Sequence, residues 1–263
     1  MVRLGGSATE SHFKVFQGLE VIFRRRGIDM DWVLYSDYDA MVDAFVKGDI
    51  DLAWNGPLGY VKIKRLLDKP CQVIAMRDVD IDFVTQFITH ADSDVLTVED
   101  LTGKRFAFGR RGSERAGLVP YHVLKQAGLD PRKDLADISF YEERQSPTAS
   151  DELDVMERVG SGEFDAGAVS QKTLEHMAKG AGLNVSRVRV FWSSPSYSHC
   201  CFTAQQDMEP RLASQIEAAF LSITGSDDVE RAVLEGEACD NFVPGVEGGW
   251  EIIEDAAVAE GLV

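Results

Sequence analysis

The chain lacks long apolar runs. No stretch of about 18 uninterrupted apolar residues occurs, so the sequence predicts no membrane-spanning helix. Its first residues lead directly into an expected strand, without the apolar segment and small-residue cleavage site of a secretory signal peptide, and without a lipid-attachment cysteine. The protein therefore either lost a leader or works in the cytosol, and the sequence leaves both readings open.

Basic residues are also scarce. The chain has 27 Lys+Arg against 44 Asp+Glu, which gives a formal net charge of −17. Nucleic acids and anionic membrane surfaces are bound through positive potential, so neither is expected as a partner. The overall charge does not restrict a small ligand, which responds to the local field of its own pocket.

Cysteine is limited to four residues, Cys71, Cys200, Cys201 and Cys239. There is no CxxC pair and no Cys/His set with the spacing of a zinc site, so we predict neither a metal site nor a cofactor. Cys200 and Cys201 would point to opposite faces of an extended segment, so a disulfide between them is not expected. A Cys71–Cys239 disulfide and the redox compartment stay open.

Helical and strand patterns alternate along the rest of the chain. Its 263 residues are 44% apolar, enough for one large or two modest domains. Short strands are expected at 2–4, 30–34, 50–54 and 72–76, separated by helices that end near Gly27, Gly48 and Leu67. This alternation is typical of an α/β fold with a mainly parallel sheet and helices on its faces.

A second α/β unit follows a crossing segment at 83–89. We expect a helical turn at 97–104, strands at 105–108, 138–141, 165–169 and 188–192, and helices ending at Gly128 and covering 151–159 and 170–179. The chain then turns at 193–195, becomes extended at 200–204 and is otherwise helical, at 210–224, 228–234 and 250–258. The predicted lobes are 1–84 plus 200–263, and 85–199. Two crossings make a hinge, and hinged lobes enclose a cleft.

Three loops leave expected strands and begin helices, at 5–9, 55–57 and 109–115. Ligands of open α/β sheets bind at the carboxyl ends of strands, where helix starts offer free N–H groups and partial positive charge. Ser7, Thr9 and Ser113 can donate hydroxyl hydrogens to an oxyanion there. The alternative reading is that these residues only cap their helices.

The loop 109–115 concentrates Arg110, Arg111 and Arg115 in an otherwise acidic chain. Its glycines allow a ligand close to the backbone, and arginine matches carboxylate or phosphoryl oxygens with two parallel hydrogen bonds. A basic loop paired with nearby acids is the alternative.

Four stretches, at 38–60, 100–109, 117–131 and 162–169, resemble the phosphonate/phosphate-binding protein family, in order and at the family's spacing. The resemblance covers about residues 35–195. It implies the two-lobed type 2 periplasmic binding protein fold, with a small anionic ligand (phosphonate, phosphate or a related oxyanion) delivered to an ABC permease without catalysis. It also implies a periplasmic or cell-envelope location, with the cytoplasm as alternative, and a monomer or weak dimer.

The resemblance extends to some pocket positions and fails at others. Ser113 and Gly117 fit the family's Ser-Thr-Ser-Gly helix start, Glu114 and Arg115 replace its middle, and Tyr60 matches its pocket tyrosine. Residues 141–146 replace its Ser/His pair, and its acidic residue for an aminoalkyl group falls near His199 or Cys200, so an aminoalkylphosphonate is not expected. The predicted ligand-binding residues are Ser7, Thr9, Tyr35, Asn55, Tyr60, Ser113, Glu114, Arg115, Arg144, His199 and Cys200.

The segment Ser198–Phe202 leaves a second hypothesis. A histidine next to a cysteine can bind a soft metal or arsenite, or support nucleophilic chemistry, whereas a buried cysteine more often serves as a small apolar residue. A cytosolic enzyme or ligand sensor on the same fold, using His199 and Cys200, is therefore the alternative function.

Overall fold

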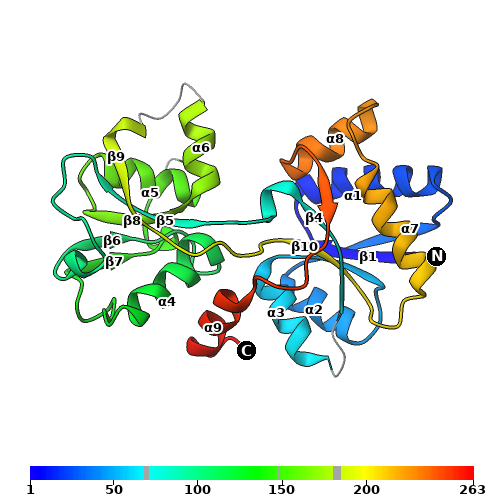
Figure 1. Ribbon diagram of the computed structural model, residues 1–263, viewed down its shortest axis with the longest axis horizontal. Coiled ribbons are helices and arrows are strands. Elements are labelled where there is room, and N and C mark those ends of the chain that lie inside the picture. The colour runs from blue at the N-terminus through cyan, green and yellow to red at the C-terminus, as the bar shows by residue number, and fades with distance from the viewer. Residues whose placement is uncertain (68–70, 147, 180–184) are drawn as a thin grey trace. The chain divides into compact units, whose positions relative to one another are not determined.

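The computed structural model of the protein describes residues 1–67, 71–146, 148–179 and 185–263 (Figure 1). The chain forms two compact units. The first contains residues 1–81 and 198–250, with Val263, and the second contains 82–197 and 251–262. Each unit has its own sheet and its own helices, as the alternating pattern predicts.

The sheet of the first unit has six strands over the described residues, in the order β11-β4-β10-β3-β1-β2. β1 pairs in parallel with β2 and β3, and β10 lies antiparallel between β3 and β4. Because β10 runs against its neighbours, it begins where they end. The strands are β1 (Val2–Ser7), β2 (Met30–Tyr35), β3 (Leu52–Asn55), β4 (Gln72–Arg77), β10 (Cys201–Ala204) and β11 (Phe242–Pro244).

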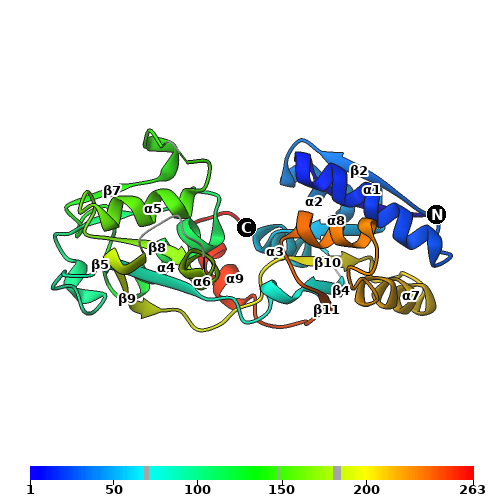
Figure 2. The same cartoon turned by 90° about the horizontal axis from the view of Figure 1, so that it is seen from above.

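Helices cover both faces of this sheet: α1, α7 and α8 lie on one face, and α2 and α3 on the other (Figure 1). α8 lies against α1, where Ser11 Oγ donates to the Gly236 carbonyl over 2.8 Å (Figure 2). The buried core includes Phe202, whose ring packs against Trp54 and Phe220. The helices are α1 (Glu10–Arg25), α2 (Tyr38–Val46), α3 (Pro57–Leu66), α7 (Pro210–Leu221) and α8 (Asp228–Glu237), with a 3₁₀ turn at Asp78–Asp80.

The second unit repeats this arrangement. Its five described strands have the order β7-β6-β8-β5-β9, with β6 parallel to β7 and β8, and β5 antiparallel to β8 and β9. In each sheet, the strand that enters from the other unit along the chain is thus inserted antiparallel among parallel strands. The strands are β5 (Thr85–His90), β6 (Arg105–Ala107), β7 (Asp137–Ser139), β8 (Ala166–Ser170) and β9 (Val188–Ser193).

The helix that follows β6 begins as a π-helix at Glu114–Leu118 and continues as α4 (Val119–Gln126). Phe87, Phe106 and Phe108 form a fully buried aromatic row under it. The other helices are α5 (Asp151–Gly160), α6 (Gln171–Lys179) and α9 (Glu251–Ala259), with 3₁₀ turns at Glu99–Leu101, Tyr141–Glu143 and Val185–Arg187. In the described ranges, no helix is long and apolar enough to cross a membrane.

Two expectations differ from the structure. No strand was expected between the helices at 228–234 and 250–258, but Phe242–Pro244 forms the edge strand β11, where proline is tolerated because its missing N–H lies outside the ladder. The last helix was expected in the first unit, whereas residues 251–262 group with the second. There α9 packs on α4, and Lys125 Nζ lies 2.6 Å from Glu260 Oε1. Local sequence patterns predict neither feature, because both depend on the surface against which the segment packs.

Candidate functional site

In the first unit, polar residues gather at the edge of the sheet where β1, β3 and β4 end. Register pairs the last residue of β3, Asn55, with the first residue of β10, Cys201. The segment His199–Cys200 therefore lies at the same edge as Ser7 and Arg77, the last residues of β1 and β4. This edge is where open α/β sheets bind ligands.

The start of α1 is capped from within. Thr9 Oγ1 accepts the His12 N–H over 3.0 Å, so the predicted capping role of Thr9 is present. The His12 ring lies with Nδ1 2.7 Å from the Ser7 carbonyl oxygen, which requires Nδ1 to carry the hydrogen. Burial lowers the pKa of His12 more than the Ser7 hydrogen bond raises it, so the ring is neutral at pH 7. Sequence reasoning missed His12, although it lies in the first turn of the helix that the loop begins.

Asn55 and Tyr60 are both buried. The Asn55 amide donates to the Ala53 carbonyl and to Thr203 Oγ1, which lies 2.7 Å away on β10. Tyr60, 4% exposed, packs its ring on Trp250 with centroids 4.3 Å apart. Trp250 Nε1 in turn donates to the His199 carbonyl over 3.1 Å. Here these residues fix the segment that carries His199. Tyr35 is partly exposed at the end of β2.

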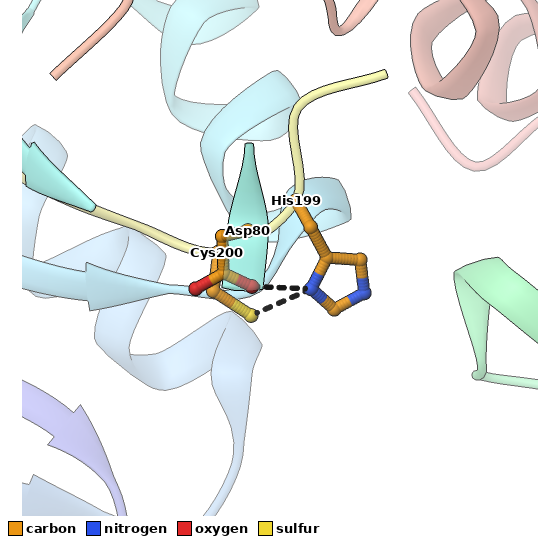
Figure 3. Close-up of side chains that lie close together, drawn as sticks. All are labelled: Asp80, His199 and Cys200. Carbon is orange, nitrogen blue, oxygen red and sulfur yellow. Dashed lines mark hydrogen bonds and ion pairs between the residues drawn. The ribbon is translucent and has the colours of Figure 1, made fainter. Parts of the chain in front are cut away.

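A buried charged network lies beside them (Figure 3). Asp80 takes two hydrogen bonds from Arg77, with Nε–Oδ2 2.6 Å and Nη2–Oδ1 2.9 Å. His199 Nδ1 lies 3.1 Å from Asp80 Oδ1 and also 3.1 Å from Cys200 Sγ. Sequence reasoning named His199 and Cys200 as candidate site residues but did not name Arg77 and Asp80.

The network sets the charges of its members. Burial alone would raise the pKa of Asp80, but hydrogen bonds from His199 and Arg77 outweigh it and lower that pKa to about 2. Burial would lower the pKa of His199, but Cys200 and Asp80 outweigh it and raise that pKa to about 10. At neutral pH the pair is a carboxylate and an imidazolium.

The four cysteines are free thiols, so the Cys71–Cys239 disulfide that the sequence left open is not formed. Burial raises the pKa of Cys71 to about 11 and that of Cys239 to about 12. Burial also raises the pKa of Cys201 well above its ordinary value. These three thiols are therefore protonated at neutral pH.

In the second unit, the loop after β6 folds tightly around Gly117. A Cβ at Gly117 would lie 2.2 Å from the Arg110 carbonyl oxygen, so only glycine fits there. Ser113 precedes the π-helix, and its Oγ accepts the Ala116 N–H over 3.3 Å. Glu114 is the first residue of that helix. The backbone N–H of Arg110 donates to the buried Asp151 carboxylate over 2.8 Å.

The three arginines of this loop lie against acids and aromatic rings. Arg111 forms an ion pair with Glu143 and stacks over Phe140. Arg115 is 39% exposed, and its Nε lies 2.8 Å from Oε2 of Glu152, which is 3% exposed. Arg110 stacks over Tyr141. The ion-pair alternative from the sequence therefore holds for Arg111 and Arg115.

Hydroxyl groups from the two crossing segments meet the same loop. Thr85 Oγ1 donates to the Arg115 carbonyl over 2.9 Å and lies 2.8 Å from the Tyr197 hydroxyl. The Ser194 hydroxyl accepts the Thr85 N–H over 3.0 Å. Burial raises the pKa of Tyr197, which stays protonated at neutral pH. No local pattern in the sequence indicates the contact between Thr85 and Tyr197, because they are 112 residues apart.

Arg144 is turned inward. Its side chain is 4% exposed, with Nε 2.7 Å from Asp154 Oδ2 and Nη2 donating to the Phe108 carbonyl over 2.6 Å. Nη1 donates to the Ser139 carbonyl, so Arg144 links the segments that follow β6 and β7. In this structure its guanidinium contacts are made within the second unit.

Residues 16–247 match the family model described as ABC transporter, phosphonate, periplasmic substrate-binding protein. The chain belongs to this family. Among its relatives, a probable ABC transporter phosphite binding protein, PhnD1, of Prochlorococcus marinus is 24% identical over 256 residues, which span 94% of this chain and 83% of the relative. The phosphate-import protein PhnD of Mycolicibacterium smegmatis is 23% identical, over 84% of this chain and 70% of its own.

Similarity to solved structures identifies the fold. The structure of Prochlorococcus marinus PhnD1 in complex with methylphosphonate has a TM-score of 0.70 and 22% identity, covering 100% of this chain and 98% of its own. XAC2383 of Xanthomonas citri, bound to chloride, has a TM-score of 0.73 and 17% identity, covering 100% and 99%. The fold is the predicted two-lobed type 2 periplasmic binding protein fold.

Family membership defines the role. The protein is a solute-binding component of an ABC importer, it binds a small anionic ligand, and its family is periplasmic. The function predicted from the sequence is thereby confirmed.

Proposed function

We propose that the ligand is a small tetrahedral oxyanion without an amino group, a phosphonate, phosphite or phosphate, and that Ser113 and Arg115 bind it. The observation that carries this proposal is the helix start at Ser113–Gly117. There Gly117 lets the Arg110 backbone fold closely against the helix, and a buried glutamate positions the partly exposed Arg115. Amide N–H groups and a guanidinium suit the negatively charged oxygens that all three anions carry on phosphorus.

In the first unit, we propose Ser7, Thr9 and Tyr60 as further contacts. Ser7 and Thr9 directly precede the start of α1, where N–H groups and partial positive charge favour an anion. Tyr60 lies on α3, the helix that begins just after Asn55.

The test is isothermal titration calorimetry with methylphosphonate, phosphite and phosphate on Ser113→Ala and Arg115→Gln. Each variant should bind at least tenfold more weakly, because a hydrogen bond to a charged group contributes about 1.5–3 kcal/mol and tenfold corresponds to about 1.4 kcal/mol. Matched controls are Ser161→Ala and Arg132→Gln, exposed residues of the same unit that the proposal leaves out. Unchanged affinity in both test variants would remove this site.

We further infer that the protein works outside the cytoplasmic membrane, with an ABC permease as its docking partner. This rests on the family, whose members are periplasmic. Fractionation of cells that make the protein at native level should place it with periplasmic markers, and its recovery with cytosolic markers would favour a sensor instead.

A further inference from the structure

The first unit brings together three potential metal ligands, one oxygen, one nitrogen and one sulfur atom. An oxygen of Asp80, a nitrogen of His199 and the sulfur of Cys200 all lie within 4.8 Å of one another (Figure 3). Asp80 and His199 are 119 residues apart in the chain. They meet because β10 is inserted antiparallel beside β4, so the residues before β10 reach the end of β4.

We propose that Asp80, His199 and Cys200 bind a thiophilic divalent cation, for which Zn²⁺ is the fitting ion. Zinc in proteins accepts thiolate sulfur, imidazole nitrogen and carboxylate oxygen in one coordination shell. Three protein ligands leave a fourth position for water or for an oxygen of an anion. This inference does not depend on which anion the protein transports.

The distances suit such an ion. His199 Nδ1 lies 3.1 Å from both Asp80 Oδ1 and Cys200 Sγ. Ligand atoms of a tetrahedral zinc lie about 3.4–3.6 Å apart when the bonds are about 2.0–2.3 Å long. These two pairs therefore need to separate by only a few tenths of an ångström, and the third pair, the Asp80 oxygen and the Cys200 sulfur, lies within 4.8 Å. Nδ1 carries at most one hydrogen, which cannot point directly at both neighbours, whereas a cation in its place contacts both.

The surroundings hold the ligands in place, as groups behind metal ligands commonly do. Arg77 fixes the Asp80 carboxylate through two hydrogen bonds. Trp250 Nε1 fixes the backbone of His199. Asp80 and His199 are buried, while Cys200 is partly exposed and gives an ion access.

Charge is the main opposing effect, because the Arg77 guanidinium repels a cation. A zinc-bound thiolate of Cys200 and the carboxylate of Asp80 together match the two positive charges of zinc, and His199 gives up the proton on Nδ1 when that atom binds the metal. Glu237, whose Oε2 lies 3.5 Å from Arg77 Nη1, is a further carboxyl group at this site and offsets the guanidinium when ionised.

The experiment uses the full chain, stripped with a chelator and carrying no histidine tag. Zn²⁺ alone is titrated by calorimetry, with metal content measured after dialysis by mass spectrometry. One zinc per chain is expected, with at least tenfold weaker binding in Cys200→Ser and His199→Gln. Cys239→Ser and Cys71→Ser, at other free thiols of the same unit, should bind zinc like the unaltered protein.

A second measurement can overturn the proposal on the unaltered protein, without relying on the folding of a variant. Cd²⁺ added to the unaltered protein should produce the ultraviolet charge-transfer absorption of a cadmium–thiolate bond, and Cys200→Ser should lack it. Absence of that absorption in the unaltered protein would overturn the proposal. So would stoichiometric zinc binding that survives unchanged in Cys200→Ser.

Discussion

Arg115 and Glu152 form an ion pair in the second unit, with the guanidinium Nε 2.8 Å from the carboxylate Oε2. The glutamate is 3% exposed and the arginine 39% exposed, so the pair lies at the boundary between core and solvent. Glu152 also accepts the backbone N–H of Ser170, at the end of β8. The pair thus joins the proposed anion-binding helix start to the sheet.

The first prediction concerns this pair. Arg115→Gln, Glu152→Gln and the double variant form a double-mutant cycle on the free energy of unfolding, measured by urea denaturation. We expect a coupling energy of about 1 kcal/mol, above that of a fully exposed pair because one partner is buried. A coupling energy of zero would mean that Arg115 does not contact Glu152 in solution.

The second prediction concerns the turn at Gly117. Gly117→Ala places a methyl group 2.2 Å from the Arg110 carbonyl oxygen, so the backbone must move, and we expect a destabilisation of roughly 1–3 kcal/mol with weaker anion binding. Gly112→Ala is the matched control in the same loop, because a Cβ there meets nothing within 4 Å. Thermal melting and calorimetry measure both effects. Equal behaviour of the two variants would contradict this account of the loop.

The third prediction separates stability from binding at Arg144. Arg144→Met removes hydrogen bonds to the Phe108 and Ser139 carbonyls and one partner of the buried Asp154. We expect a loss of about 3 kcal/mol of unfolding free energy, limited because Arg158 still pairs with Asp154. Ligand affinity measured well below the melting temperature should fall by less than threefold. A tenfold loss of affinity in a folded variant would instead make Arg144 a ligand contact, as the sequence suggested.

The fourth prediction concerns ligand choice. Asp80, an acid at this edge of the first unit, is already paired with Arg77 and His199, so its carboxylate is not available to hold an ammonium group. 2-Aminoethylphosphonate should therefore bind at least tenfold more weakly than methylphosphonate in calorimetry. The reverse order of affinities would show that another acid receives the amino group.

Local patterns predicted much of this molecule because its elements are amphipathic and sharply bounded. Phe16, Leu19 and Phe23 share the buried face of α1, with Thr9 capping its start and Gly27 following its end. The same patterns, combined with the family stretches, indicated the fold and the transport role. β11 was missed because three residues carry no period of their own, and its pairing depends on the edge of β4.

Local patterns do not predict which polar side chains will meet in the polar clusters. Nothing near Asp80 in the sequence indicates that His199 will face it, because the contact follows from the antiparallel insertion of β10. In the same way, the sequence showed Arg115 as one of three basic residues in a loop but could not identify Glu152 as its partner. Side-chain partners across a sheet depend on strand order, which the sequence reasoning left undefined.

The fifth prediction is a pH dependence that arises from Glu237. Its side chain is 2% exposed, and burial raises its pKa to about 7, against a smaller lowering by Arg77. Because the folded protein holds this proton more tightly than the unfolded chain, the resulting stability is fully present below about pH 4.5 and is lost as pH rises toward 7. Each pKa unit corresponds to about 1.4 kcal/mol, so the loss is at most about 3 kcal/mol.

Glu237→Gln removes this titration. Its unfolding free energy relative to that of the unaltered protein should therefore increase between about pH 4.5 and 7 and stay constant above. Urea denaturation at several pH values measures the difference, with Glu235→Gln, an exposed neighbour on α8, as the control. A difference that stays flat across this range would show that Glu237 is ionised in the fold throughout it. Arg77 would then compensate its burial fully, and the network around Asp80 would carry one more negative charge than this structure implies.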